Sequence, residues 1–273
     1  MKLLKYFVLY LVCINISVTP CLSDKKFTAY FSNDSVNGLK ISDAYETHNM
    51  GFKIDAEDNF YVLDFGIVSP DMHLYKNQFR KANRSFGELI SFQVGKDLDD
   101  FENVKVSYYS KVTASGKFGI DKIQDSTHKL LNLRPVNYVN DMVRMPDRIW
   151  FGVGGNVAAP ISDRFPSLDF IKVDAYAGTD RIEVSSSLEK ITSFENFSFT
   201  SELGLRLIAN DNIISSPPVY AEIRKIIPHL TFGLNFEYLG AKWYIRDKFS
   251  LPTIISDDSI YGVLSAGVVL ELD

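Results

Sequence analysis

Short segments in which apolar and polar residues alternate recur along most of the chain, separated by Asp, Asn, Gly, Ser and Pro. Within residues 231–240, the residues Phe, Leu, Phe, Tyr and Gly alternate with Thr, Gly, Asn, Glu and Leu. A period of two is typical of β-strands with one apolar and one polar face. The pattern predicts strands at residues 27–31, 51–55, 60–68, 86–94, 104–112, 149–157, 170–177, 182–188, 197–208, 219–226, 229–245 and 261–272.

The predicted strands make the protein all-β, with about twelve strands when one hairpin is allowed for inside the longest predicted segment. Loops are predicted at residues 135–148, 163–169, 210–218 and 246–258. The chain is 46% hydrophobic and contains 20 Phe and 14 Tyr. Alternating strands and abundant aromatic residues are typical of a transmembrane antiparallel β-barrel with aromatic girdles. A soluble β-sandwich or lipocalin-like barrel remains the alternative, because the chain ends in Asp273 rather than in the aromatic residue of many membrane barrels.

Residues 121–132, with the sequence DKIQDSTHKLLN, have helical rather than strand spacing. Gln124 and His128 are four residues apart, which places them on one face of a helix. Three apolar residues, Ile123, Leu130 and Leu131, surround them in the sequence. The pattern predicts a short helical segment near residues 121–132, and its composition is that of a plug for a barrel.

The N-terminus has the layout of a secretory signal peptide. A basic start is followed by an apolar run over residues 6–18, and then by small residues and a proline before Asp24. The run is shorter than the roughly 20 residues of a membrane-spanning helix, so we prefer cleavage to an N-terminal anchor. We therefore expect a signal peptide at residues 1–23 and a single barrel domain at residues 24–273. Both cysteines, Cys13 and Cys21, fall in the leader, which leaves no disulfide, zinc site or thiol nucleophile.

The formal net charge of −5 comes without a basic stripe, which argues against a nucleic-acid partner. No nucleophile elbow, phosphate-binding glycine loop or His-Glu-x-x-His motif occurs. Four polar places remain as candidate sites: Asn33-Asp34, residues 46–51, residues 69–76 and residues 124–128. Taken singly, each has a structural explanation. In order, these explanations are an Asn-Asp turn, a polar strand start, a surface lysine and a hydrogen-bonded histidine.

Taken together and in order, the four places resemble the outer-membrane lipid A 3-O-deacylase family. The resemblance covers roughly residues 26–132. It is carried by Asn33-Asp34, by the Thr47–Gly51 region, by Ser69-Pro70 followed by Lys76, and by Gln124-x-x-x-His128. Asn83-Arg84-Ser85-Phe86 also resembles the family's motif before its fourth strand. Counting back from Gly51 without a gap places Asn49, rather than Thr47, at the family's threonine, so both are candidate site residues.

The resemblance implies a twelve-stranded barrel whose site opens at the outer leaflet. There, a calcium-dependent hydrolysis removes the 3-linked acyloxyacyl chain of lipid A. It implies that His128 is the general base, that Asp34 holds the calcium ion with Asn33 beside it, and that Lys76 stabilises the oxyanion. Gln124, one turn before the histidine, is expected to orient the imidazole or the water.

The expected partners are lipid A or lipopolysaccharide and the outer membrane of a Gram-negative bacterium, with the protein as a monomer. The alternative is a non-catalytic barrel, either a porin, a surface-binding protein or a family member with lost activity. A phospholipase-type barrel requires a histidine followed closely by serine. His229 is instead followed by Leu230-Thr231, so we do not expect that activity.

Overall fold

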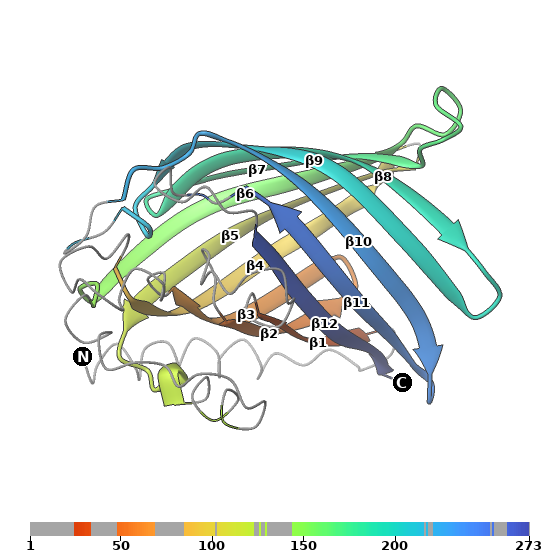
Figure 1. Cartoon of the computed structure of the whole chain (residues 1–273). Helices are drawn as coiled ribbons and strands as arrows, with labels where there is room; N and C mark the ends of the chain where they lie inside the picture. Colours follow the sequence, from red (N-terminus) through yellow and green to blue (C-terminus); the bar gives the residue numbers. More distant parts are fainter. Residues whose placement is uncertain are drawn as a thin grey trace.

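The computed structural model describes residues 25–33, 48–68, 85–101, 103–122, 126, 129, 144–215, 217, 221–251, 253 and 261–272. Twelve antiparallel strands form a closed barrel in which each strand pairs with its neighbours in sequence, and β1 pairs with β12 (Figure 1). The strands are β1 (Lys25–Asn33), β2 (His48–Ala56), β3 (Asn59–Val68), β4 (Gly87–Phe101), β5 (Val104–Gly116), β6 (Arg148–Pro160), β7 (Phe170–Gly178), β8 (Arg181–Ser193), β9 (Phe197–Asp211), β10 (Ile226–Tyr238), β11 (Ala241–Ser250) and β12 (Tyr261–Leu272). The predicted all-β barrel of about twelve strands is confirmed.

The two ends of the barrel differ in the length of their connections. At one end, turns of two or three residues join β2–β3, β4–β5, β8–β9 and β10–β11, a loop of residues 161–169 joins β6–β7, and the C-terminal strand also finishes there (Figure 1). The β10–β11 turn has Leu239 and Gly240 with positive φ (54° and 71°), as a two-residue type I′ hairpin turn requires. The longer connections, which follow β1, β3, β5, β9 and β11, all leave from the other end. We call the end with the longer connections the mouth.

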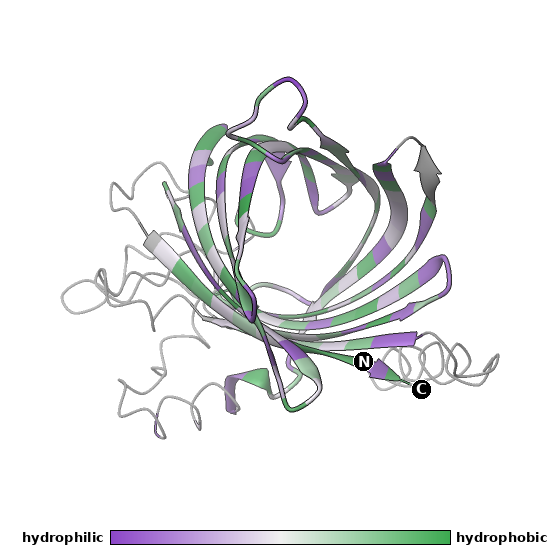
Figure 2. Ribbon diagram, turned by 90° about the vertical axis from the view of Figure 1, so that its right-hand side faces the viewer, coloured by the Kyte–Doolittle hydropathy of each residue, from purple (hydrophilic) through white to green (hydrophobic). Residues whose placement is uncertain are grey.

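The side chains alternate between an apolar outer wall and a polar lumen. On the outer wall, Phe151, Val153 and Leu203 are 60%, 58% and 62% exposed. Charged residues such as Glu202 and Arg206 lie on the lumen side of the same strands, where they form ion pairs. Figure 2, which looks into the barrel from the short-turn end, shows these alternating bands. A soluble sandwich or lipocalin-like barrel would bury such apolar residues, so that alternative is wrong.

Glycines on the lumen side accommodate aromatic rings from neighbouring strands. A Cβ atom at any of these glycines would collide with the ring, so only glycine leaves room for it to lie against the wall. Such pairing of an aromatic ring with a cross-strand glycine helps to fix strand register. The pairs are Tyr30 with Gly51, Phe60 with Gly95, Tyr109 with Gly154, Tyr176 with Gly152 and Tyr244 with Gly267.

Two sequence predictions about the strands are wrong. The described residues 221–225 of the predicted strand 219–226 do not form a strand: Ile223 makes a single β-bridge, and Ala221 and Ile223 pack in a buried cluster. Residues 246–250 were expected to lie in a loop but belong to β11. Their charged side chains suggest a loop in a soluble protein, whereas in a barrel they can face a polar lumen.

The predicted helical segment is confirmed where the structure describes it. Asp121, Lys122, Ser126 and Lys129 are helical, and the Ser126 hydroxyl donates a hydrogen bond to the carbonyl of Lys122 (2.8 Å). Among the described residues, no helix has both the length and the apolar character needed to cross a membrane. The predicted signal peptide, with Cys13 and Cys21, lies outside the described residues.

Candidate functional site at the barrel mouth

The strands that precede the predicted site residues in the chain end at neighbouring points of the mouth. The connections after β1, β3 and β5 start from Asn33, Val68 and Gly116, which all end their strands at the mouth. Asn33 pairs with His48 on one side and Leu264 on the other. Asp34, Thr47, Lys76, Gln124 and His128 lie in these connections and outside the described residues. Their catalytic roles therefore stay predictions.

Asn49 is the predicted site residue whose side chain the structure describes. It lies opposite Ser32 of β1 and Gly66 of β3, close to the mouth. Its Oδ1 atom is buried and has no hydrogen-bond partner among the described residues. An unpaired buried amide oxygen is unfavourable by about 1–3 kcal/mol, so this atom is set up to accept a hydrogen bond or to contact a cation.

A row of lumen-facing residues crosses the wall beside Asn49. Strand register places neighbouring members of the row directly opposite each other across β1 to β6. The row consists of Tyr30, Gly51, Asp64, Ser91, Thr113 and Trp150. The Tyr30 hydroxyl donates a hydrogen bond to Asp64, and the Ser91 hydroxyl donates another at 3.2 Å. Two donors on separate strands thus hold the Asp64 carboxylate in place.

A cavity of about 60 Å³ lies between this row and the opposite wall. Its polar lining comes from Asn49, Asp64, Ser91, Lys111, Thr113, Asp180 and Arg181, and its apolar lining includes Val68, Leu89 and Ile213. Thr113 is 3% exposed, and its hydroxyl, like the Asn49 oxygen, has no partner among the described residues. Asp64 and Thr113 are not among the site residues predicted from the sequence. The available signal was that both are polar residues at lumen-side positions near the mouth.

On the outer wall of β4, a buried carboxylate anchors both ends of the β5–β6 connection. Glu88 is 0% exposed. Its Oε2 atom accepts hydrogen bonds from the backbone N–H groups of Phe118 (2.8 Å), Gly119 (2.6 Å) and Ile120 (2.9 Å). Its Oε1 atom accepts one from Arg144 (3.0 Å), near the other end of the connection. A carboxylate that receives several N–H groups and a guanidinium makes strong, charge-assisted bonds.

This anchor shows where the predicted helical segment begins. Ile120, one residue before it, is 3% exposed and packs with Ile67 of β3 and Phe86. Ile67 occupies a position of β3 whose side chain belongs to the outer wall and points away from the lumen. The expectation of a plug is therefore wrong for the start of this segment, which lies against the outside of the barrel (Figure 2).

The described residues do not by themselves form a metal site. Among them, no group of three His, Cys, Asp or Glu side chains could hold an ion. They do offer oxygen donors near the mouth, namely the unpaired Asn49 carboxamide and the Asp64 carboxylate. Oxygen ligands of this kind suit calcium.

Among solved structures, LpxR from Salmonella typhimurium has the same fold. The TM-score is 0.70 over 90% of this chain and 99% of that chain, with 11% sequence identity. The NanC porin has a TM-score of 0.48 and 9% identity over 91% of this chain and 100% of that chain. A KdgM porin has a TM-score of 0.43 and 8% identity over 91% of this chain and 99% of that chain. No protein-family profile and no curated protein sequence matches the chain.

The likeness to LpxR establishes the fold. The chain is a closed twelve-stranded barrel of the kind found in the outer membranes of Gram-negative bacteria. At 11% identity the likeness goes no further than the fold.

Proposed function

We propose that this protein is an outer-membrane hydrolase that removes the 3-O-linked acyloxyacyl chain of lipid A. LpxR, whose fold it shares, is a lipid A 3-O-deacylase. The observation that carries the proposal is that the family's four motifs occur in order in three connections that all leave from the mouth. The same topology brings Asn49, a residue of the second motif, to the wall beside these connections.

In this proposal, His128 removes a proton from the water that attacks the ester carbonyl. A histidine has a pKa close to neutral pH, which suits it to general-base catalysis. Lys76 places positive charge where the oxyanion develops, which favours the tetrahedral intermediate. Gln124 orients the imidazole or the water. Because water is the nucleophile, the reaction needs no serine or cysteine.

Calcium would be held by Asp34 and the adjacent Asn33, with the Asn49 carboxamide as a further oxygen donor. These groups are the carboxylate and amide oxygens that calcium prefers. The unpaired Oδ1 atom of Asn49 supports this choice, since a bound cation would satisfy it. When bound, the ion would polarise the ester carbonyl.

The mouth would face the cell exterior, because outer-membrane barrels have short turns on the periplasmic side and longer loops outside. The outer leaflet, where lipid A is found, would then surround the outer wall near the mouth. Ile149 and Phe151 of β6 are exposed on that wall (40% and 60%), and acyl chains would contact them.

Mass spectrometry of lipid A tests this function. A Gram-negative host expressing the wild-type protein should lose one acyloxyacyl unit, in a calcium-dependent manner. His128→Ala should abolish the loss, because a general base contributes about 10²–10⁴-fold to the rate. Ser126→Ala is the matched control, since Ser126 is exposed in the same segment and bonds only to Lys122 in the described structure. Unchanged lipid A with a well-folded wild-type barrel would instead favour a non-catalytic barrel.

A further inference from the structure

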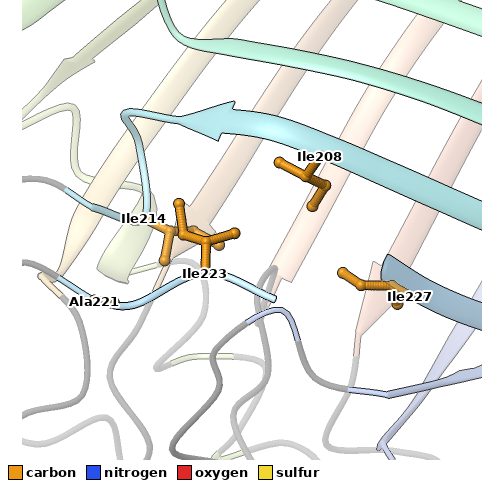
Figure 3. Close-up of a cluster of buried hydrophobic side chains, with 5 residues drawn as sticks. All are labelled: Ile208, Ile214, Ala221, Ile223 and Ile227. Atoms are coloured by element: carbon orange, nitrogen blue, oxygen red, sulfur yellow. The ribbon is translucent and has the colours of Figure 1, made fainter. Parts of the chain in front are cut away.

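The described residues of the connection between β9 and β10, which are 212–215, 217 and 221–225, pack against the lumen side of the barrel. Ile214, Ala221 and Ile223 of this connection form one buried cluster with Ile208 of β9 and Ile227 of β10 (Figure 3). Ile208 and Ile227 are each 2% exposed, while the adjacent Leu207 and Ile226 are 45% and 58% exposed on the outer wall. Since alternate residues of a strand face opposite sides, the cluster lies inside the barrel.

The same connection crosses the lumen. Ile213 forms a second buried cluster with Val68 of β3, Trp150 of β6 and Met145. In the closed order of twelve strands, β3 and β9 are six strands apart and therefore stand on opposite walls. A residue that directly follows β9 can pack on β3 only if the connection spans the space between these walls. The cavity described above also runs from β2 and β3 to Arg181 of β8, with Ile213 in its lining.

Hydrogen bonds hold this connection in place at several points. The Asp211 carboxylate, which is 0% exposed, accepts N–H groups from Ile213 (3.1 Å) and Ile214 (3.0 Å). Asn212 donates its backbone N–H to the carbonyl of Asp180 (2.6 Å) and its side-chain amide to the carbonyl of Thr179 (2.8 Å). These bonds tie the start of the connection to the β7–β8 turn.

The far side of the connection is tied as well. The N–H of Ile208 bonds to the carbonyl of Lys225 (2.9 Å). The N–H of Arg224 bonds to the carbonyl of Thr253 (2.6 Å), which follows β11. The connection is thus fixed to the wall at both of its ends, as a folded part of the barrel interior.

Below this layer the lumen is polar and roomy. A cavity of about 810 Å³ lies near the short-turn end, with Lys53, Asn235, Glu237, Lys242 and Arg246 among its lining residues. The lumen side of the same half carries ion pairs such as Lys172 with Glu189 and Lys53 with Asp55. The apolar layer and the polar space therefore occupy opposite ends of one lumen.

We propose that the described residues of this connection, 212–215, 217 and 221–225, form a plug that closes the lumen at the mouth, so that the barrel does not conduct ions. The lumen is then a water-filled vestibule open only at the short-turn end. A hydrated ion crossing the plug would have to give up its water of hydration between isoleucine, methionine and tryptophan side chains, and this desolvation is strongly unfavourable. Apolar constrictions of this kind close channels by excluding water. The proposal does not depend on hydrolase activity, and it separates this barrel from a porin.

Conductance of the full-length protein in planar lipid bilayers tests the plug. The wild type should give no steady channel steps. The double variant Ile213→Asp/Ile214→Asp should open, with conducting events at least tenfold more frequent, because two buried charges draw water into the apolar layer. The matched control Ile213→Leu/Ile214→Leu keeps the volume and apolar character, and should stay silent. Steady conductance of the wild type at the level of the Asp variant would overturn the proposal.

Thiol cross-linking tests the crossing independently and remains informative if the Asp variant fails to fold. Val68→Cys/Ile213→Cys should join efficiently through a short bismaleimide, because the two side chains pack together. The control pair Val68→Cys/Leu207→Cys should not join, since Leu207 faces outward on the opposite wall. Equal yields from the two pairs, or no reaction of the first, would show that the connection does not cross the lumen.

Discussion

The mouth and the short-turn end of this barrel share the same twelve strands and the same inside–outside alternation, yet they differ in what fills the lumen. At the mouth, the described parts of the β5–β6 and β9–β10 connections pack on the wall, and the lumen contains apolar clusters and a small cavity whose lining includes polar atoms without a partner among the described residues. At the short-turn end, the turns leave the space open, and the charged residues there are paired. Charged side chains are stable where water can solvate them. Where a connection excludes water, buried polar atoms need a hydrogen-bond partner or a ligand.

The largest stability effect should come from the buried carboxylate at the mouth. Glu88→Ala removes an acceptor from three backbone N–H groups and leaves the Arg144 guanidinium without this partner. Breaking a buried charged pair destabilises by about 3–5 kcal/mol, and we expect that loss in urea unfolding of the barrel. Hydrogen exchange at residues 118–120 should rise as well.

The matched control for Glu88 is Glu271→Ala at the short-turn end. Glu271 pairs with Lys242 at 2.8 Å, but both side chains are about 60% exposed (61% for Lys242 and 59% for Glu271). We expect its unfolding midpoint to match that of the wild type. Similar losses from the two substitutions would contradict the contrast between a dry mouth and a wet short-turn end.

A pair of glycine substitutions separates stability from activity. A Cβ atom at Gly51 would collide with Tyr30 and Asp64, whereas at Gly267 it would collide with Tyr244. Overpacking of this kind destabilises by about 1–3 kcal/mol, so Gly51→Ala and Gly267→Ala should lower the free energy of unfolding to a similar extent. Of the two, Gly51→Ala should also reduce lipid A hydrolysis, because it disturbs the hydrogen bond that holds Asp64 next to Asn49. Equal activities in lipid A mass spectrometry would argue against a site at this wall.

The smallest effect should be a pH dependence at the turn between β6 and β7. The N–H of Ile191 (2.6 Å), and after it the ammonium of Lys190 (3.1 Å), lower the pKa of Asp169 from its ordinary value. A lowered carboxyl pKa adds stability above the unfolded-state value of about 4, and this is lost as the pH falls through the folded-state pKa. Protection of the Ile191 amide from hydrogen exchange should therefore decrease below about pH 4. In Asp169→Asn, this change with pH should be absent.

Much of the wall could be predicted from the sequence, because one barrel strand shows its period of two without reference to any other strand. The strand predictions were wrong where the environment of a residue depends on contacts with distant parts of the chain. Residues 246–250 look like a loop because they are charged, although charged side chains are at home in a polar lumen. Residues 219–226 look like a strand, although Ala221 and Ile223 are apolar because they fill the plug.

The site was predicted differently, through the order of its motifs. Asn49, one of the residues named in this way, lies near the mouth beside the β1–β2 connection, and its part in a site stays a prediction. The order of the motifs could not reveal Glu88, Asp64 or Thr113, because a single buried glutamate, aspartate or threonine has no local signature. Asp64 and Glu88 depend on partners 27 to 56 residues away in the chain, such as Ser91 for Asp64 and Arg144 for Glu88.

The sequence by itself determined the all-β barrel, its apolar outer wall and the set of mouth connections that carry the motifs. These follow from local alternation and from the order of short segments, both of which are written along the chain. Only the tertiary structure decided which segment closes the lumen. The helical segment expected to do so begins on the outer wall, whereas the β9–β10 connection crosses the interior. The physical reason is that burial is a property of opposing walls: Ile213 becomes a plug residue only when barrel closure brings Val68 across from it.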